Sequence, residues 1–183
     1  LHTCALKLDA TVRCWGDDWY QQSTPPAGLS NVIAVSAGTY HSCSLLANGS
    51  AACWGGRGGE EATVPLNDDR LASVVAGDRV TCAIRASRMV TCWGDAGLSR
   101  LISDLGPVLQ ISRPSPNGFC ALTIKGTVRC IGGYAFPYQG ADGLGEVRSF
   151  SIGGTHACVL SDASGLQCVG NGIRGQAAVL AEL

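Results

Sequence analysis

The sequence predicts an all-β protein built from five repeats, and two observations support this prediction. The ten cysteines form five pairs whose members lie ten positions apart, and successive pairs follow at intervals of 39, 39, 38 and 38 residues. A constant period of this size is typical of repeat architectures. No segment has apolar residues at helical spacing, whereas short β-branched segments alternate with loops that contain glycine or proline.

Each repeat contains three predicted strands in the same order. The first strand carries the first cysteine of a pair, as in residues 41–45, and the second carries its partner, as in residues 51–55. The third strand is a β-branched segment that ends on glycine, as in residues 32–38. We place all repeats in one domain, residues 1–183, with units at about 1–38, 39–77, 78–115, 116–153 and 154–183.

Four recurring features of these repeats resemble a known family. They are the small-Cys-Ala-Leu strand, the Cys-Trp-Gly strand, the Val-x-x-Val-x-Ala-Gly strand, and Gly175-Gln176 together with Val64-Pro65. The pattern is similar to the cysteine-paired form of the regulator of chromosome condensation (RCC1) repeat, found in CRINKLY4 receptor kinase ectodomains and in secreted bacterial proteins. The resemblance implies a β-propeller with one four-stranded blade per repeat, usually seven blades in all. Repeat 4 departs most from the pattern, because Ile131 replaces tryptophan and residues 115–118 replace Ala-Gly-x-x-His.

A short hairpin turn between the two cysteine strands places the paired cysteines opposite each other. In repeat 2, residues 47–49 (Ala-Asn-Gly) fit a three-residue loop whose third residue is left-handed. Counting back from this turn pairs Cys43 with Cys53 at a non-hydrogen-bonded position, where Cα atoms are about 4.5 Å apart and a disulfide can form. We therefore predict five disulfides: Cys4–Cys14, Cys43–Cys53, Cys82–Cys92, Cys120–Cys130 and Cys158–Cys168. In repeats 1, 3 and 5 this glycine is replaced by Ala10, Arg88 and Ser164. We expect somewhat different turns in these three repeats.

Zinc binding is the alternative role for these cysteines. The sequence contains no Cys-x-x-Cys motif and no cluster of cysteine and histidine at a structural zinc spacing. Disulfides within the hairpins are therefore the favoured interpretation. Ten cysteines paired in this way indicate an oxidising compartment, so we expect a secreted or cell-surface protein.

Three histidines share one position of the repeat and are expected to be structural. His2, His41 and His156 each stand two residues before the first cysteine of a pair. Equivalent positions in a ring of repeats do not converge on one point, which argues against a three-histidine metal site. We expect each histidine to form a hydrogen bond with its own turn.

The tryptophans of the Cys-Trp-Gly strands are expected to lie in the core. Trp15, Trp54 and Trp93 would each lie across the hairpin from a small residue. In repeat 4 the large residue moves to the other strand, since Phe119 would face Ile131. A core position of limited volume produces this kind of exchange.

Composition and motifs argue against nucleic-acid binding and catalysis. The net charge is −1, which is unlike a phosphate-binding surface, and no apolar run reaches the length of a membrane span. The chain lacks a nucleophile elbow and a phosphate-binding glycine motif, so we expect a non-enzyme without cofactor or metal. The acidic pairs at 17–18 and 60–61 are expected to be solvated charges in loops.

The loops that follow the Cys-Trp-Gly strands are the candidate binding surface. The repeats diverge there, and exposed aromatic and arginine side chains often anchor protein interfaces. The candidate residues are Trp19, Tyr20, Arg57, Tyr134, Phe136, Tyr138 and Arg174. Packing of these aromatics on neighbouring loops is the structural alternative.

These observations favour an extracellular recognition or adhesion module that binds a protein through one propeller face. One alternative is a structural building block that self-assembles in a surface layer or fibre. Another is a secreted inhibitor of enzymes such as β-lactamases, which the resemblance to bacterial proteins allows.

Two further expectations concern modification and ring closure. Asn48 belongs to the single Asn-x-Ser/Thr sequence and is expected on an exposed turn, where a eukaryotic source could glycosylate it. The chain starts at a first cysteine strand and stops before the strand that would complete the fifth repeat. We therefore expect an incomplete ring that belongs to a larger propeller or is covered by a partner or a second copy.

Overall fold

The computed structural model describes residues 1–65, 70–94, 102, 104–113, 118–132, 146–153 and 156–170 and confirms the all-β prediction. The first six strands are β1 (His2–Leu6), β2 (Val12–Gly16), β3 (Val32–Ala37), β4 (His41–Leu46), β5 (Ala51–Gly55) and β6 (Leu71–Ala76). The next four are β7 (Val80–Arg85), β8 (Val90–Gly94), β9 (Val108–Ile111) and β10 (Gly118–Thr123). The last four are β11 (Val128–Gly132), β12 (Val147–Ile152), β13 (His156–Ser161) and β14 (Gly165–Gly170). A short 3₁₀ helix, η1 (Glu60–Ala62), follows β5.

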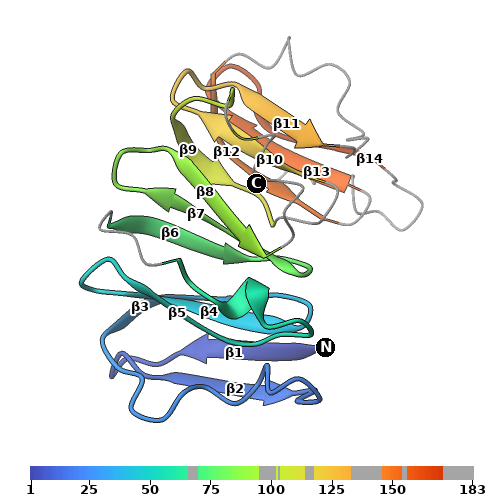
Figure 1. The fold of residues 1–183 in the computed structure, drawn as a ribbon. Coiled ribbons are helices and arrows are strands. Elements are labelled where there is room, and N and C mark those ends of the chain that lie inside the picture. The colour runs from blue at the N-terminus through green and yellow to red at the C-terminus, as the bar shows by residue number, and fades with distance from the viewer. Residues whose placement is uncertain are drawn as a thin grey trace.

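The strands form five small antiparallel sheets, which are the blades of the fold. The first contains β1 and β2, and the others contain β3-β4-β5, β6-β7-β8, β9-β10-β11 and β12-β13-β14. The sheets follow one another in a row, with hairpin turns along one face and longer loops along the other (Figure 1). We call these the turn face and the loop face. As predicted, the row does not close into a ring.

The blades differ in two respects from the repeats expected from the sequence. Among the described residues each complete blade has three strands, whereas the family resemblance implied four. The third strand of each predicted unit also joins the hairpin of the next unit, as β3 does with β4 and β5. The physical blade therefore begins with the β-branched strand.

All five predicted disulfides are present. Each joins the two strands of one hairpin, and the paired Cα atoms lie 3.9–4.1 Å apart. In repeat 2, Cys43 faces Cys53 in the strand register, as counting from the turn predicted. No cysteine remains free.

The prediction of altered turns is wrong for repeats 1 and 3 and correct for repeat 5. Ala10 and Arg88 adopt positive φ angles of 60° and 68°, the same left-handed conformation as Gly49 at 86°. In repeat 5 the left-handed residue is Gly165, one position after the expected Ser164.

A hydrogen bond between blades explains why Ala10 and Arg88 keep this strained conformation. The carbonyl of Ala10 accepts a bond from the Val32 amide at 3.0 Å, and that of Arg88 accepts one from the Val108 amide at 2.9 Å. Gly49 forms the same bond with Leu71 at 2.8 Å. Left-handed backbone costs a residue other than glycine about 1–2 kcal/mol, and a buried amide without a partner costs a similar amount.

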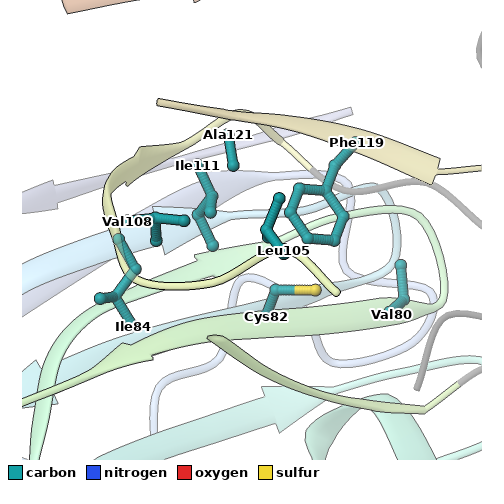
Figure 2. Close-up of a cluster of buried hydrophobic side chains, with 8 residues drawn as sticks. All are labelled: Val80, Cys82, Ile84, Leu105, Val108, Ile111, Phe119 and Ala121. Atoms are coloured by element: carbon teal, nitrogen blue, oxygen red, sulfur yellow. The ribbon is translucent and has the colours of Figure 1, made fainter. Parts of the chain in front are cut away.

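Buried side chains from neighbouring blades form the core between the sheets. The largest described cluster joins the third and fourth blades and includes Val80, Leu105 and Phe119 (Figure 2). Phe119 faces Ile131 in the register, as predicted, and is 1% exposed. The large buried side chain of this pair thus lies on the first strand of the hairpin, whereas in the second and third blades it is a tryptophan on the second strand.

The prediction that the tryptophans are buried holds for two of the three. Trp54 is 6% exposed and Trp93 is 8% exposed, whereas Trp15 is 52% exposed. The indoles of Trp54 and Trp93 each donate a hydrogen bond to the loop that follows the preceding blade. Trp15 lies on the first blade, and no described sheet precedes this blade and covers it.

Replacing Gly38 by alanine should destabilise the contact between the second and third blades. An added Cβ would lie 2.5 Å from the carbonyl oxygen of Gly77 and 2.9 Å from that of His41. Both are backbone atoms that cannot rotate away, so we expect a loss of about 2 kcal/mol or more in the free energy of unfolding. Urea denaturation with the disulfides intact measures it.

Gly58→Ala is the matched control for Gly38→Ala. Neither glycine has a positive φ, and a Cβ on Gly58 would have only one neighbour, a carboxylate oxygen of Glu61 at 3.7 Å. We expect a change within about 0.5 kcal/mol for this variant. Equal losses in the two variants would contradict the steric explanation.

Candidate functional site

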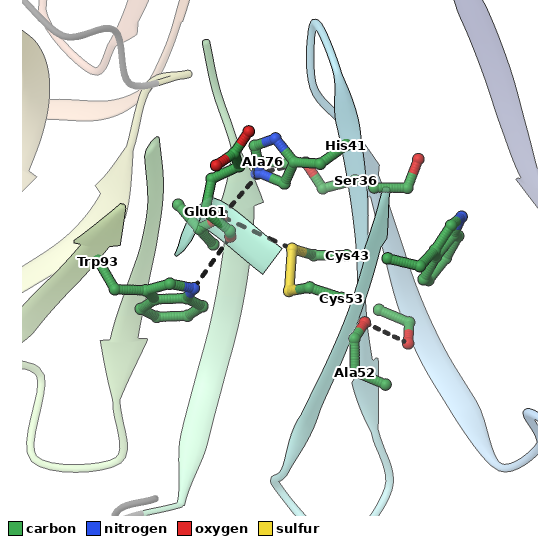
Figure 3. Close-up of a disulfide and its surroundings, with 12 residues drawn as sticks. Ser36, His41, Cys43, Ala52, Cys53, Glu61, Ala76 and Trp93 are labelled. Carbon is green, nitrogen blue, oxygen red and sulfur yellow. Dashed lines mark hydrogen bonds between the residues drawn. A yellow bond between two sulfur atoms is a disulfide. The ribbon is translucent and has the colours of Figure 1, made fainter. Parts of the chain in front are cut away.

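The loop face is held together by two backbone carbonyls that each accept two side-chain donors from the next blade. The carbonyl of Gln22 accepts from the Trp54 indole and the Ser42 hydroxyl, both at 3.0 Å. The carbonyl of Glu61 accepts from the Trp93 indole at 3.1 Å and the Thr81 hydroxyl at 2.7 Å (Figure 3). We call each such arrangement a carbonyl junction.

A histidine completes each carbonyl junction from the opposite side. The Nε2 atom of His2 lies 2.7 Å from the Ser42 hydroxyl oxygen, and Nε2 of His41 lies 2.7 Å from that of Thr81. Each hydroxyl proton is already donated to a carbonyl, so each ring must be the donor and carry its proton on Nε2.

His2 and His41 therefore bond to the following blade, and for these two histidines the prediction of a bond to their own turns is wrong. Sequence spacing alone cannot reveal this, since the partner lies 40 residues away. Nδ1 of His2 and of His41 is buried, and no described residue forms a hydrogen bond with either atom.

The glycine of the Cys-Trp-Gly strand makes room for the junction. Gly55 and Gly94 have φ angles of 81° and 97°, which favour glycine. A Cβ on Gly55 would lie 2.8 Å from the Cα atom of Gln22, and one on Gly94 would lie 3.1 Å from that of Glu61. The loop of each blade thus crosses the next blade at this glycine.

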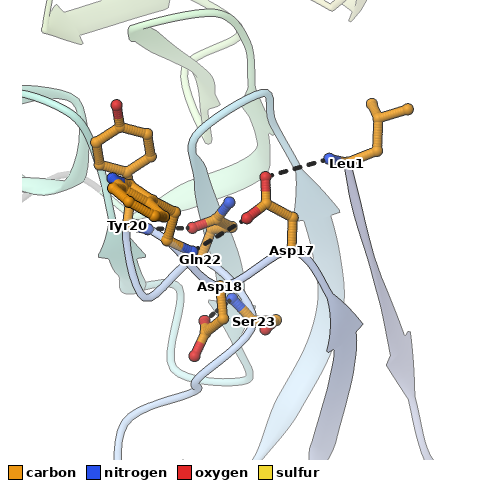
Figure 4. A network of polar contacts seen from close by, with 7 residues as sticks. Leu1, Asp17, Asp18, Tyr20, Gln22 and Ser23 are labelled. Carbon is orange, nitrogen blue, oxygen red and sulfur yellow. Dashed lines mark hydrogen bonds and ion pairs between the residues drawn. The ribbon is translucent and has the colours of Figure 1, made fainter.

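The first loop is ordered by hydrogen bonds to its own side chains (Figure 4). The Asp17 carboxylate accepts the Trp19 amide at 3.1 Å, and the side-chain oxygen of Gln22 accepts the Tyr20 amide at 2.7 Å. The bond from the Trp19 amide lowers the pKa of Asp17. Trp19 projects from this loop with 84% of its surface exposed.

Asp18 ties the same loop to the segment that follows it. Its carboxylate accepts the Thr24 hydroxyl at 2.7 Å and the Ser23 amide at 2.8 Å. These bonds, that from Thr24 first, lower the pKa of Asp18. The acidic pair at 17–18 is exposed, as predicted, but it also fixes the loop backbone.

The second loop encloses a buried carboxylate, contrary to the prediction of solvated charges. Glu61 is only 3% exposed, and its Oε1 atom accepts the Arg57 amide at 2.8 Å and the Gly58 amide at 3.4 Å. Above it lies an open pocket of about 490 Å³. The pocket is lined by Arg57, Gly58, Glu60, Glu61, Arg79 and Gly94.

Tyr40 joins the first loop to the second. The Tyr20 and Tyr40 rings meet edge to face, with centroids 5.4 Å apart and an interplanar angle of 82°. The Tyr40 carbonyl in turn accepts the Gly56 amide at 2.9 Å. The predicted binding residues Trp19, Tyr20 and Arg57 thus lie along one connected surface, which we call the recognition surface.

Sequence reasoning missed Tyr40 and Arg79, which belong to the same surface. Each stands immediately before the first cysteine strand of its blade, at a position where the repeats also diverge. Comparing that position between repeats would have indicated both residues. The predicted residues Tyr134, Phe136, Tyr138 and Arg174 lie outside the described residues.

The predicted glycosylation residue lies on the opposite face. Asn48 is exposed on the hairpin turn of the second blade, and its side-chain oxygen accepts the Ser50 amide at 3.0 Å and the Ser50 hydroxyl at 2.8 Å. A group attached to Asn48 would project from the turn face, away from the recognition surface.

The described residues form neither a metal-binding cluster nor a membrane-spanning helix. They contain no group of three or more His, Cys, Asp or Glu side chains placed to hold a metal ion. None of their helices is long and apolar enough to cross a membrane.

Comparison with known proteins identifies the fold. Residues 32–58, which contain the whole second blade, match the family model of the regulator of chromosome condensation (RCC1) repeat. The fold is that of an RCC1-like propeller. No curated protein matches the sequence.

Three solved structures of RCC1-like proteins resemble the chain. The ectodomain of the Physcomitrella patens receptor kinase CR4 is 22% identical with a TM-score of 0.70, over 92% of this chain and 48% of that one. The CRINKLY WD40 ectodomain of the Arabidopsis thaliana receptor kinase ACR4 is 24% identical with a TM-score of 0.70, over 92% and 64%. Human WBSCR16 is 19% identical with a TM-score of 0.73, over 97% and 61%. The chain thus spans about half to two-thirds of the length of these proteins.

The buried His41 at one carbonyl junction should make the stability of this RCC1-like fold depend on pH. Desolvation by burial lowers the pKa of His41 from 6.5 to about 4. The unfolded chain takes up a proton below pH 6.5 that the folded chain binds only near pH 4. The contribution of neutral His41 to stability is therefore complete above pH 6.5, the pKa of His41 in the unfolded chain. It is lost as the pH falls toward about 4, the pKa in the folded chain, and the free energy of unfolding decreases by about 3 kcal/mol in total.

Urea denaturation of the wild type and of His41→Gln between neutral pH and pH 4 tests this dependence. Glutamine retains a donor toward Thr81 but does not titrate, so its free energy of unfolding should fall less steeply with acid. Identical pH dependence in the two proteins would show that His41 does not control acid stability.

Proposed function

We propose that this chain is a non-catalytic extracellular module that binds a protein partner through the recognition surface. The observation that carries the proposal is Trp19, which is 84% exposed on a loop whose backbone is fixed by Asp17 and Gln22. An exposed tryptophan on an ordered loop can bind with little loss of conformational entropy. Its connection to the Arg57 pocket through Tyr20 and Tyr40 extends this surface over two blades.

The disulfides and the structural neighbours support an extracellular location. Five disulfides within hairpins are stable in an oxidising compartment. Two of the neighbours are ectodomains of receptor kinases. Asn48 is proposed as a glycosylation residue in a eukaryotic source, since a glycan on the turn face leaves the recognition surface open. Inhibition of a secreted enzyme would be one form of this binding.

Replacing Trp19 by alanine should weaken partner binding and leave the fold intact. Trp19 has almost no packing to lose, while a tryptophan at the centre of an interface contributes about 2 kcal/mol or more. The partner is first captured from the secreted and surface proteins of the source organism and identified by mass spectrometry. Its affinity for the wild type and for Trp19→Ala is then measured by calorimetry.

Leu8→Ala is the control for Trp19→Ala. Leu8 is as exposed as a residue can be, but it lies on a hairpin turn of the opposite face. This variant should bind like the wild type. A partner that binds Trp19→Ala with wild-type affinity would show that the recognition surface is wrongly assigned.

Self-assembly is the second candidate function, and the exposure of Trp15 favours it. This side chain occupies the position of the buried Trp54 and Trp93 but keeps 52% of its surface exposed. A copy of the chain that covered Trp15 would bury an aromatic ring of the kind common in interfaces.

Light scattering over a range of protein concentrations distinguishes the two candidate functions. A building block should show a mass that rises with concentration and returns to that of a monomer in Trp15→Ser. A soluble recognition module should remain a monomer, with or without this substitution, at every concentration measured.

A further inference from the structure

We propose that the pocket between Arg57 and Arg79 binds a carboxylate side chain, so that the partner presents an aspartate or glutamate there. This inference rests on the proposed function and adds the chemistry of the partner. The two arginines come from neighbouring blades, since Arg57 follows β5 and Arg79 precedes β7. Both are exposed, and both line the same pocket.

Within the part of the chain that the structure describes, both guanidinium groups lack an ionic partner. No described residue forms an ion pair with either side chain; the bond that Arg57 donates to Glu61 comes from its backbone amide. Two positive charges on one pocket repel each other, and a carboxylate between them would relieve this repulsion. Arginine also offers paired N–H donors whose spacing matches the two oxygens of a carboxylate.

The pocket is kept open by two glycines. Gly58 and Gly94 are part of its lining and carry no side chain. At Gly94 a side chain is excluded, because a Cβ would lie 2.6 Å from the carbonyl oxygen of Arg79 and the φ of 97° disfavours other residues. The hollow is therefore a consequence of the carbonyl junction beneath it.

The acidic residues that line the pocket form no ion pair with Arg57 or Arg79. Glu61 is 3% exposed, and its carboxylate accepts two backbone amides of its own loop. Glu60 is exposed and forms no ion pair with a described residue. Glu60 therefore repels a bound carboxylate, and its removal should strengthen binding.

Titration of the whole 183-residue chain with a short peptide tests the carboxylate site without a partner. The probe is acetyl-Gly-Glu-Gly-amide, and the matched control peptide has glutamine in place of glutamate. NMR spectroscopy follows the arginine Nε–H signals and the amides of Gly58 and Gly94. The glutamate peptide should shift the Arg57 and Arg79 signals saturably, and the glutamine peptide should not.

Three variants test the assignment. Arg57→Ala should weaken binding of the glutamate peptide about tenfold or more, and Glu60→Gln should strengthen it. Arg13→Ala, which removes an exposed arginine of β2 outside the pocket, should change nothing. Equal affinity of wild type and Arg57→Ala would overturn the proposal. So would equal shifts with both peptides, or tighter binding of inorganic phosphate than of the glutamate peptide.

The peptide titration and the Trp19 experiment can fail independently. Trp19 lies on a different loop and does not line the pocket, so Trp19→Ala should bind the glutamate peptide like the wild type. If only the peptide titration fails, the proposed carboxylate site is wrong and the recognition surface stands. If only Trp19→Ala keeps the affinity of the wild type for the partner, the recognition surface is wrongly assigned and the carboxylate site stands.

Discussion

The structure of the loop face depends on one interaction, the backbone carbonyl that accepts two donors from the next blade. Gln22 and Glu61, which lie 39 residues apart in the sequence, provide these carbonyls. Each carbonyl lies between an indole and a hydroxyl. An unpaired carbonyl, indole or hydroxyl in a buried setting would each cost free energy. Satisfying all three at one point fixes the angle between blades and anchors the loop that exposes Trp19. The binding surface and the blade contact are therefore products of the same hydrogen bonds.

The contact between the third and fourth blades replaces this polar arrangement by an apolar one. Phe119 stands where Ser42 and Thr81 supply hydroxyls, Ile131 stands where Trp54 supplies an indole, and Val80 stands where His41 supplies an imidazole. Replacing the hydroxyl, the indole and the imidazole together by apolar side chains leaves no side-chain donor unpaired. Replacing only one of them would leave a buried polar group without its partner. The same backbone fold thus tolerates two kinds of blade contact.

The sequence predicted what is local and missed what depends on distant partners. Counting from one turn predicted the register of every cysteine pair, because hairpin geometry is set within about a dozen residues. The turns at Ala10 and Arg88 were mispredicted, since the bond that holds them comes from the following blade. The same reason applies to His41, which bonds Thr81 40 residues away, and to Glu61, whose backbone carbonyl is bound by Thr81 20 residues away. Trp19 could be recognised as a candidate from its loop alone, while Arg79 could be recognised only by comparing the position before the first cysteine strand between repeats.

The disulfides have a mechanical consequence. Each one closes a loop inside a single hairpin, and none joins two blades. Under tension applied to the ends of the chain, no disulfide resists the separation of two blades, so the blades would separate one at a time. Within each separated blade the covalent ring cannot extend, and only the loop and the β-branched strand lengthen. Such a chain lengthens in short, regular steps as blades unfold. It retains five disulfide-closed hairpins, from which each blade can refold.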